Sequence, residues 1–398
     1  MTKDALRILM IAPTPYFCDR GCHVRIYEEA RAMTKLGHEV SIVTYHLGRD
    51  MPGVRVVRTP GIPWYNKLEA GPSWHKPYLD ILLLWKSLAE ARLFRPHLIH
   101  AHLHEGALIG FVLKLLTCIP LLFDYQGSLT GEALNHGFFH KRSLLTNIFN
   151  WIENFINRRA DIIVTSSDQG RQELLTTRGI APKKVFNLID GVDTEVFRPH
   201  SQSEARRELG IPDTVKVVAY LGLFNQYQGV DLLMDVISLL KKNSSAMRFL
   251  LMGFPDEEYR RKAQAMGIDD VIIFTGRVPY ERAAFYLSAG DLAVSPKLAQ
   301  TEANGKLFNY MACGLPTIAF ESNINREILG DTGIYVEFGN TAAMAATIAA
   351  SLSDSEGMMS LAKKVRDRAI NIHSWNSRSL LLESVYKKIV APGTTSDF

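Results

Sequence analysis

The stretch "RILMIAPTPYFCDRGCHVRIYEEARAMTKLGHEVSIVT", Arg7–Thr44, contains the unit from which the fold can be predicted. It opens with an apolar run, Arg7–Ala12, that is typical of a buried strand. The amphipathic segment Arg25–Leu36 predicts a helix, and a turn at Gly37 leads into a second apolar run, Val40–Thr44. This strand–helix–strand order predicts two parallel strands whose connecting helix covers the sheet.

The same rhythm continues along the first half of the chain and then starts again. Apolar runs predict further strands at Leu98–His102, Pro120–Phe123, Ile162–Ser166 and Val185–Ile189, and then at Val215–Gly222, Met247–Met252, Val271–Thr275, Leu292–Ser295, Thr317–Phe320 and Gly333–Val336. We therefore predict an α/β chain with two Rossmann-like parallel-sheet domains. Phe197–Thr214, rich in Pro, Ser and charge, is the expected hinge, and a final helix is expected at Ser377–Val390.

Two such domains place the carboxyl ends of two parallel sheets opposite each other. Ligands of open α/β sheets bind at those ends, so the cleft between the domains is the expected active site. No GxGxxG follows a strand and no GxxxxGK[ST] occurs, which argues against nicotinamide cofactors and P-loop chemistry.

Composition narrows the class of protein. The 398 residues are 47% hydrophobic and 22% charged, and a net charge of +4 is too small to indicate nucleic-acid binding. The apolar stretch Gly106–Phe123 is interrupted by Lys114 and Pro120, which favours a buried helix followed by a strand over a membrane span. The first residues predict a strand rather than a signal peptide. The chain has four cysteines, Cys18, Cys22, Cys118 and Cys313. They fit neither a disulfide framework nor paired zinc ligands, so we expect a cytoplasmic protein.

Five stretches, taken in order, carry a family resemblance: Asp19–Thr44, "IDGVDTEVFRP" (Ile189–Pro199), "VAYLGLFNQYQGVDLLMDVI" (Val218–Ile237), "FTGRVPYE" (Phe274–Glu281) and "TEANGKLFNYMACGLPTIAF" (Thr301–Phe320). Together they resemble retaining glycosyltransferases of the GT-B fold, in the family 4 group. The resemblance covers about Arg7 to Val390. It implies an enzyme that moves a sugar from a nucleoside-diphosphate donor to a hydroxyl acceptor with retention of configuration.

The resemblance also assigns the domains. Residues 1–196 would bind the acceptor and residues 197–372 the nucleotide sugar, while the closing helix and polar tail, 373–398, would return to the first domain. The acceptor would be a carbohydrate or lipid-linked molecule. No cofactor or metal is expected. In such enzymes the leaving diphosphate is thought to help deprotonate the acceptor, so no strong side-chain base is needed.

The loop Asn304-Gly305-Lys306 stands at the start of a short predicted helix. Helix N-termini present unpaired N–H groups that bind phosphate, and glycine allows close approach of the backbone. An ammonium group can meet a diphosphate as a point charge. The resemblance implies that this loop faces the donor diphosphate; the alternative for Lys306 is a solvated surface lysine.

Several positions depart from the family pattern. Relatives carry two glutamates eight positions apart in this stretch. The second glutamate contacts the ribose in relatives, and here its position is taken by Asn309. Glu302 stands beside the position of the first glutamate and is expected near the sugar ring. An Arg and a Lys that neutralise the diphosphate in relatives are replaced by Leu223 and Gln228. Lys306 is the expected substitute, with Lys297 or Arg277 as alternatives.

The first domain departs as well. Gln126 stands where many relatives have a histidine near the transferred sugar, and it can hydrogen-bond but cannot titrate. Asp190 replaces the usual asparagine. Gly21 is expected near the donor phosphates and His23 near the acceptor, although a plain helix start explains both equally well.

The remaining predicted contacts come from loops. Gly222 is expected at the donor, and the backbone of Gly276, Arg277 and Val278 against the base. His104 and Trp74, the latter in an aromatic loop, are weaker acceptor candidates. His100, His102 and His104 alternate, so they would share one strand face if the strand continued. A metal site there is conceivable, but none is expected because relatives use none.

A further segment bears on membranes. Leu144, Leu145, Ile148, Phe149, Ile152, Phe155 and Ile156 form an apolar stripe beside Trp151, with Arg158 and Arg159 at its end. This pattern is typical of an interfacial helix, so peripheral contact with the inner membrane face is conceivable. A helix that faces the core of the first domain is the favoured interpretation.

Two other functions remain open. The chain could be a degenerate subunit that binds a nucleotide sugar without catalysis, or a nucleotide-sugar epimerase of the same fold. Release of free nucleoside diphosphate on adding an acceptor would distinguish transfer from both.

Overall fold

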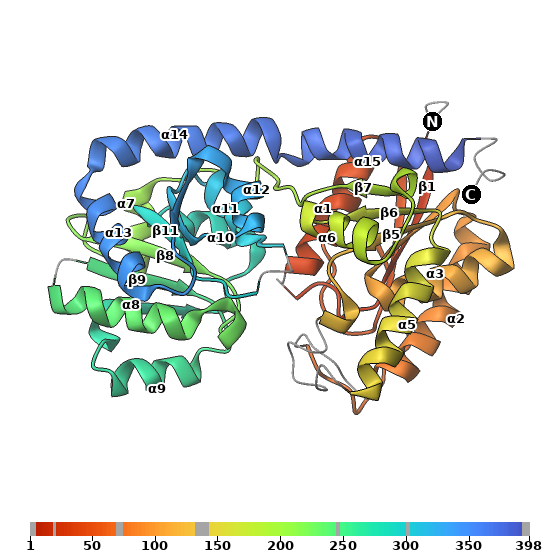
Figure 1. Ribbon diagram of the computed structural model, residues 1–398, viewed down its shortest axis with the longest axis horizontal. Helices are drawn as coiled ribbons and strands as arrows, with labels where there is room; N and C mark the ends of the chain where they lie inside the picture. The colour runs from red at the N-terminus through yellow and green to blue at the C-terminus, as the bar shows by residue number, and fades with distance from the viewer. Residues whose placement is uncertain are drawn as a thin grey trace. The chain divides into compact units, whose positions relative to one another are not determined.

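The computed structural model describes residues 5–18, 21–68, 75–131, 143–243, 247–299 and 303–391. The chain forms two compact units, each a parallel sheet with helices on both faces (Figure 1). The first unit comprises Met1–Asp190, Thr301–Ala303 and Trp375–Phe398, and the second Gly191–Gln300 and Asn304–Ser374. The predicted α/β class is confirmed.

The first unit has a parallel sheet in the order β3-β2-β1-β4-β5-β6-β7. Its strands are β1 (Arg7–Ala12), β2 (Glu39–Thr44), β3 (Arg55–Arg58), β4 (Leu98–His102), β5 (Leu121–Tyr125), β6 (Ile162–Thr165) and β7 (Val185–Asn187). Its helices are α1 (Gly21–Lys35), α2 (Lys76–Phe94), α3 (Leu103–Thr117), α5 (Leu144–Arg159), α6 (Asp168–Gln172) and α15 (Trp375–Val390), with a π turn at Glu173–Thr177 and a 3-10 turn at Pro182–Lys184.

The two faces of this first sheet differ in chemistry. Ile99 and Ala101 of β4 join the apolar core under α2, α3 and α5. Because side chains alternate along a strand, His100 and His102 point to the opposite face, where α1 and α15 pack. That face therefore buries polar groups beneath two helices.

The second unit has a parallel sheet in the order β10-β9-β8-β11-β12-β13. The strands are β8 (Lys216–Leu221), β9 (Met247–Met252), β10 (Ile272–Gly276), β11 (Leu292–Ser295), β12 (Thr317–Phe320) and β13 (Gly333–Val336). The helices are α7 (Gln202–Leu209), α8 (Val230–Asn243), α9 (Glu257–Ala265), α10 (Tyr280–Leu287), α11 (Lys306–Ala312), α12 (Asn323–Leu329), α13 (Thr341–Ser353) and α14 (Ser355–Ile372), with 3-10 turns at Gln226–Gln228, Asp269–Val271 and Gly330–Thr332.

Residues from α8, α9 and α13 form one apolar core with this second sheet. The order of strands reverses between β8 and β11, as it does between β1 and β4 in the first unit. These reversals are where open α/β sheets bind ligands.

The predicted strands all form, within two residues of the expected ends. Strand β3 was missed because it is a short, half-exposed edge strand flanked by arginines. The hinge expectation for Phe197–Thr214 is wrong: this segment contains α7, whose Arg206 pairs with Asp291 at 2.8 Å and donates to Ala289 O. It is thus packed into the second unit.

The closing helix forms as predicted and belongs to the first unit. Helix α15 packs on α1, and the indole of its Trp375 donates to Glu28 at 2.5 Å. The apolar stretch Gly106–Phe123 falls in α3 and β5 as expected. Within the described ranges, no helix combines the length and apolarity that crossing a membrane requires.

Candidate functional site

Three loops of the second unit meet at the carboxyl edge of its sheet. Gly222, after β8, donates its N–H to Met252 O at 3.0 Å, and Gly253, after β9, donates to Gly276 O at 3.0 Å. A Cβ on Gly253 would lie 1.9 Å from Gly222 O. Glycine therefore lets these backbones approach one another, as phosphate-binding loops require.

Lys306 reaches into this edge from the first turn of α11. Its Nζ donates to Gln228 Oε1 at 2.7 Å and to Tyr220 Oη at 3.2 Å, and it lies 4.3 Å from the centre of the Tyr220 ring. A Cβ on Gly222 would approach Nζ to 3.0 Å. The ammonium group thus stands beside Gln228, one of the two positions where relatives have a cation.

Burial, followed by the nearby charge of Lys297, lowers the pKa of Lys306 well below its ordinary value. An anion bound next to Nζ would favour the charged form and oppose this shift. Binding of a negatively charged ligand would therefore raise the pKa of Lys306 back toward its ordinary value.

The loop before α11 is held from both sides. Asn304 Nδ2 donates to Ser295 Oγ and to Asn325 Oδ1, each at 2.9 Å. Leu298 N donates to Tyr227 O at 2.9 Å, and a Cβ on Gly229 would lie 1.8 Å from Pro296 O. The loops after β8 and β11 are thus packed against each other at the strand-order reversal.

The remaining donor-side residues flank this edge. Gly276 has φ +68°, Val278 is buried, and the exposed Arg277 guanidinium lies 4.7 Å from the centre of the Phe254 ring. Asn309 is half-buried, three residues after Lys306 on α11, and Gly305 is the residue before that helix. Because residues three apart lie on one helix face, Asn309 and Lys306 face the same way.

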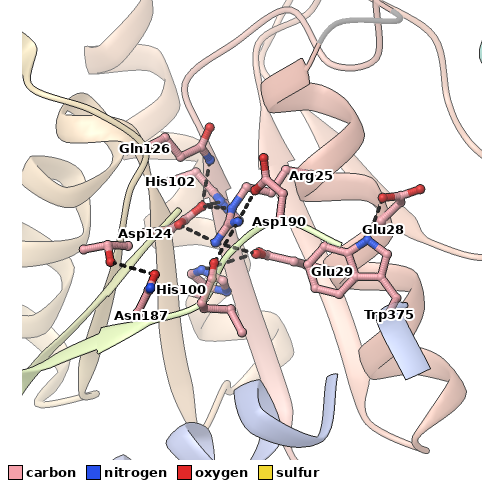
Figure 2. A network of polar contacts seen from close by, with 12 residues as sticks. Arg25, Glu28, Glu29, His100, His102, Asp124, Gln126, Asn187, Asp190 and Trp375 are labelled. Atoms are coloured by element: carbon pink, nitrogen blue, oxygen red, sulfur yellow. Dashed lines mark hydrogen bonds and ion pairs between the residues drawn. The ribbon is translucent and has the colours of Figure 1, made fainter. Parts of the chain in front are cut away.

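Gln126, after β5, begins the candidate site of the first unit. Its Nε2 donates to Asp124 Oδ2 at 2.7 Å. Asp124 also accepts two hydrogen bonds from Arg25, at 2.9 and 3.0 Å, and one Oδ2 contact from His102 Nδ1 at 2.9 Å (Figure 2). Burial alone would raise the pKa of Asp124, but Arg25 and His102 hold it well below its usual value.

Arg25 ties α1 to β5 and to the segment that follows β7. Besides Asp124, it pairs with Glu29 at 3.0 Å and with Asp190, and it donates to Leu188 O at 3.2 Å (Figure 2). Asp190, expected to be a minor departure, is thus a partner of the central cation. A carboxylate here adds a third negative charge around Arg25, which an asparagine would not.

A buried carboxylate holds the loop that carries Gln126. Glu153 of α5 accepts from Ser128 Oγ at 3.1 Å, from Thr130 N at 3.1 Å and from Thr130 Oγ1 at 2.7 Å. It also pairs with Arg178 at 3.1 Å. The loop after β5 is therefore fixed at both ends, by Asp124 and by Glu153.

The acceptor-side histidines do not gather around Gln126. His23 is fully buried; its Nδ1 accepts from Cys18 N at 2.9 Å and its Nε2 contacts Thr14 Oγ1. Both ring nitrogens hold the loop before α1. Gly21 is the exposed first residue of that helix, with open space around its Cα.

The alternating histidines do not share one face. The strand ends at His102, so His104 lies on α3, against Phe123 and Tyr125 of the other sheet face. The condition for a three-histidine face thus fails, whereas His100 and His102 remain side by side. Glu302 and Trp74 lie outside the described residues. In the aromatic loop, Tyr65 packs on His75, with ring centres 5.3 Å apart.

Sequence reasoning missed Arg25, Glu29 and Asp124 as parts of a site. One signal was present: Arg25 and Glu29 are spaced i, i+4 and bracket Ile26, which lies on the buried face of α1. Charged residues on the buried face of a helix indicate that an oppositely charged partner lies inside the fold. Asp124 gave no such signal, because its partners are distant in sequence.

Two parallel α/β units, each with loops at a strand-order reversal, are the architecture of the GT-B fold. Solved structures of low identity share the fold. Sucrose-phosphate synthase from Thermosynechococcus elongatus has a TM-score of 0.79 at 20% identity, over 96% of this chain and 98% of that one. Anabaena HepE in complex with UDP-glucose has a TM-score of 0.77 at 16% identity, over 96% and 100%.

Sequence comparisons give the family. A "Glycosyl transferase 4-like domain" model matches residues 20–187, and a "Glycosyl transferases group 1" model matches residues 215–354. D-inositol 3-phosphate glycosyltransferase of Corynebacterium glutamicum is 25% identical, over 93% of this chain and 92% of its own length. Sulfoquinovosyl transferase SQD2 of Arabidopsis thaliana is 23% identical, over 92% and 70%. The chain belongs to the family 4, group 1 glycosyltransferases and is a glycosyltransferase, which confirms the resemblance.

Proposed function

We propose that this glycosyltransferase moves a sugar from a nucleoside-diphosphate donor, bound by the second unit, to a hydroxyl acceptor bound by the first, with retention of configuration. The observation that carries the proposal is the position of Lys306 Nζ, 2.7 Å from Gln228 Oε1 in the turn Gln226–Gln228 that follows β8. Relatives neutralise the leaving diphosphate from this position, and here the charge comes from α11 instead.

The proposed transfer step runs without a metal ion. Lys306 would stabilise negative charge as it grows on the leaving diphosphate, and a site prepared in advance favours the transition state over the ground state. The glycines at 222 and 276 would admit the diphosphate and the base to the backbone, and Asn309 would hydrogen-bond the ribose. Gln126 and Glu302 would lie near the transferred sugar.

The names of the similar proteins guide the choice of donor and acceptor. One relative is named for inositol 3-phosphate and another for sulfoquinovosyl transfer, while HepE was solved with UDP-glucose. We propose a UDP-sugar as the first donor to test and a phosphorylated polyol or a glycolipid as the first acceptors.

The test begins with a thermal-shift screen of UDP-, GDP-, ADP- and dTDP-sugars, because a ligand at 100 times its Kd stabilises by about 2.7 kcal/mol. With the donor found, acceptor-dependent release of nucleoside diphosphate and the anomeric configuration of the product by NMR are measured. Donor binding without release in any acceptor series would support a non-catalytic subunit. Release without acceptor, with a new free sugar isomer, would support an epimerase, and an inverted product would reject retention.

We also propose that the first unit contacts an anionic membrane surface through α5. The core-facing interpretation of this helix is wrong for its first turns: Leu144 is 75% exposed and Trp151 68%, whereas the buried residues include Thr146 and Glu153. Arg159 lies over the Phe155 ring at 4.7 Å, at the end of the same stripe. Exposed apolar side chains flanked by basic ones suit the interface of an anionic bilayer.

Sedimentation with vesicles tests this surface. Vesicles with anionic phospholipid should retain the protein and purely zwitterionic vesicles much less. A Leu144→Ser/Trp151→Ser variant should lose the retention, whereas Met359→Ser, at an equally exposed position of α14, should keep it. Equal retention of both variants would reject the surface.

A further inference from the structure

A second cluster lies beneath the candidate site of the first unit, on the α1 and α15 face of the sheet. Glu29 of α1, His100 and His102 of β4, and Asp124 of β5 are fully buried, and each offers a ligand atom within 4.8 Å of the others (Figure 2). The two imidazole rings stand side by side, with centres 4.3 Å apart. Alternate residues of one strand thus present two ring nitrogens to the same side.

The outer nitrogens of both rings are already engaged. His102 Nδ1 lies 2.9 Å from Asp124 Oδ2, and His100 Nδ1 lies 2.7 Å from the hydroxyl of Tyr386 on α15. Because a carboxylate only accepts, His102 carries its proton on Nδ1, which leaves a lone pair on Nε2. Metal-binding histidines are oriented in this way, by a carboxylate or another oxygen on the second nitrogen.

The inner polar atoms lack hydrogen bonds. Within the described part of the chain, neither Nε2 of His100 or His102 nor either carboxylate oxygen of Glu29 has a hydrogen-bond partner, although all are buried. Glu29 Oε1 faces Arg25 as an ion pair at 3.0 Å, and its Oε2 faces His100 Nε2 at 3.8 Å. Each unsatisfied buried polar group costs about 1–3 kcal/mol, so several around one point require an explanation.

The charges of the cluster also favour a bound cation. The carboxyl groups of Glu29, Asp124 and Asp190 surround the guanidinium of Arg25, which leaves a surplus of negative charge when all three are ionised. A bound dication would balance this surplus.

We propose that Glu29, His100 and His102 bind a structural Zn²⁺ ion, with Asp124 and Tyr386 orienting the two imidazoles. Two imidazoles and a carboxylate form a known zinc ligand set, which a water molecule can complete to four. Zn–N and Zn–O bonds of about 2.0–2.2 Å require ligand atoms roughly 3.4 Å apart, so the 3.8 Å separation of Glu29 Oε2 and His100 Nε2 needs only a small contraction. The ion joins α1 to β4 and takes no part in the proposed transfer.

This inference revises the sequence prediction of a chain without a metal, and it does not depend on the proposed function. Asp124 is assigned an orienting role because Arg25 and Gln126 already occupy its oxygens. His104 provides an internal control: it is buried two residues after His102, on α3, but faces Glu153 on the other side of the sheet.

Metal analysis of the full chain, purified without a histidine tag and reconstituted with Zn²⁺, tests the site. We expect about one zinc per chain after removal of loosely bound ion, and none after stripping with a strong chelator. Glu29→Gln, which preserves shape, and His102→Gln should reduce the retained zinc at least tenfold, whereas His104→Gln should retain it. Zinc below about 0.1 per chain in the reconstituted parent would overturn the proposal.

Two further measurements keep the test decisive if His102→Gln does not fold. Adding Zn²⁺ to the stripped parent should raise its unfolding midpoint, and the same addition should leave Glu29→Gln unchanged. Co²⁺ in place of zinc should give the visible absorption of a low-coordinate ion, which Glu29→Gln should lose. An unchanged midpoint together with no cobalt spectrum would mean that the cluster is a network of ion pairs alone.

Discussion

The carboxyl edges of the two sheets are built from different chemistry. In the first unit, Arg25 and Asp124 are buried and fix the edge by charge-assisted hydrogen bonds. In the second unit, Gly229 and Gly253 bring backbone within distances that no side chain would allow, and the half-buried Lys306 places its amino group beside Gln228. The first edge should therefore be sensitive to removal of a charge and the second to addition of a carbon atom.

The largest expected effect is loss of the buried cation. Arg25→Met leaves three carboxyl groups without their shared partner, and breaking a buried pair in this way costs about 3–5 kcal/mol. Hydrogen exchange of β4 and β5, measured by mass spectrometry, reports the first unit separately from the second. Arg260→Met is the matched control, because Arg260 is exposed and pairs with its i, i+4 partner Asp256 at 2.6 Å. It should cost about 1 kcal/mol or less; similar costs for the two variants would refute the comparison.

A smaller effect is expected from one added methyl group in the second unit. Gly229 has φ +74°, and its Cβ would lie 1.8 Å from Pro296 O. Gly229→Ala should therefore cost about 3 kcal/mol, the sum of left-handed strain and overpacking. Gly210→Ala is the control: its φ is +67°, but its Cβ would meet open space. It should cost only about 1 kcal/mol, as judged by exchange of β8 and β9. Equal costs would mean that the close approach is unimportant.

A third expected effect concerns pH. Burial, with Glu105 nearby, raises the pKa of Asp80 to about 7, although Tyr45 donates to it at 2.6 Å. An unfolded aspartate titrates near 4, so the folded protein holds the extra proton between these values, and stability falls as pH rises through this window. Above about pH 7 the loss is complete.

Asp80→Asn removes that loss. The variant should gain little at pH 4.5 and more at pH 8, as measured by the unfolding midpoint of the first unit. Glu208, an exposed acid of the second unit that pairs with Arg282, supplies a contrast: Glu208→Gln should show no such gain at pH 8. A gain for Asp80→Asn that is the same at both pH values would contradict the assignment.

Much of the fold followed from local pattern. Fully buried strands such as β1 and β9 are continuous apolar runs, which a sequence displays directly. The edge strand β3 escaped because its burial is partial, and α7 was mistaken for a hinge because its surface charges resemble those of a linker. Both errors concern solvent-exposed segments, where exposure to water rather than secondary structure determines which residue types occur.

The candidate sites divide in the same way. Lys306 and the glycines of the second unit stand in short loops with a recognisable order, so their meeting at one edge was predictable. The Arg25–Asp124–Asp190 cluster joins residues 99 and 165 positions apart. The cluster forms only because each side chain points to the same face of the sheet. Strand β4 ends at His102, so His104 lies on α3 and outside the cluster.

The central claim is that Lys306 provides the positive charge for the leaving diphosphate. The decisive measurement is kcat for acceptor-dependent nucleotide release at saturating donor. Lys306→Ala should lower kcat about 10²-fold, or about 2.7 kcal/mol, with a smaller change in donor affinity, and Lys306→Gln should be nearly as poor because it lacks charge. Leu223→Arg with Gln228→Lys should partly rescue Lys306→Ala, and Lys242→Ala, an exposed lysine of α8, should match the parent. Turnover of Lys306→Ala within about threefold of the parent would contradict the account.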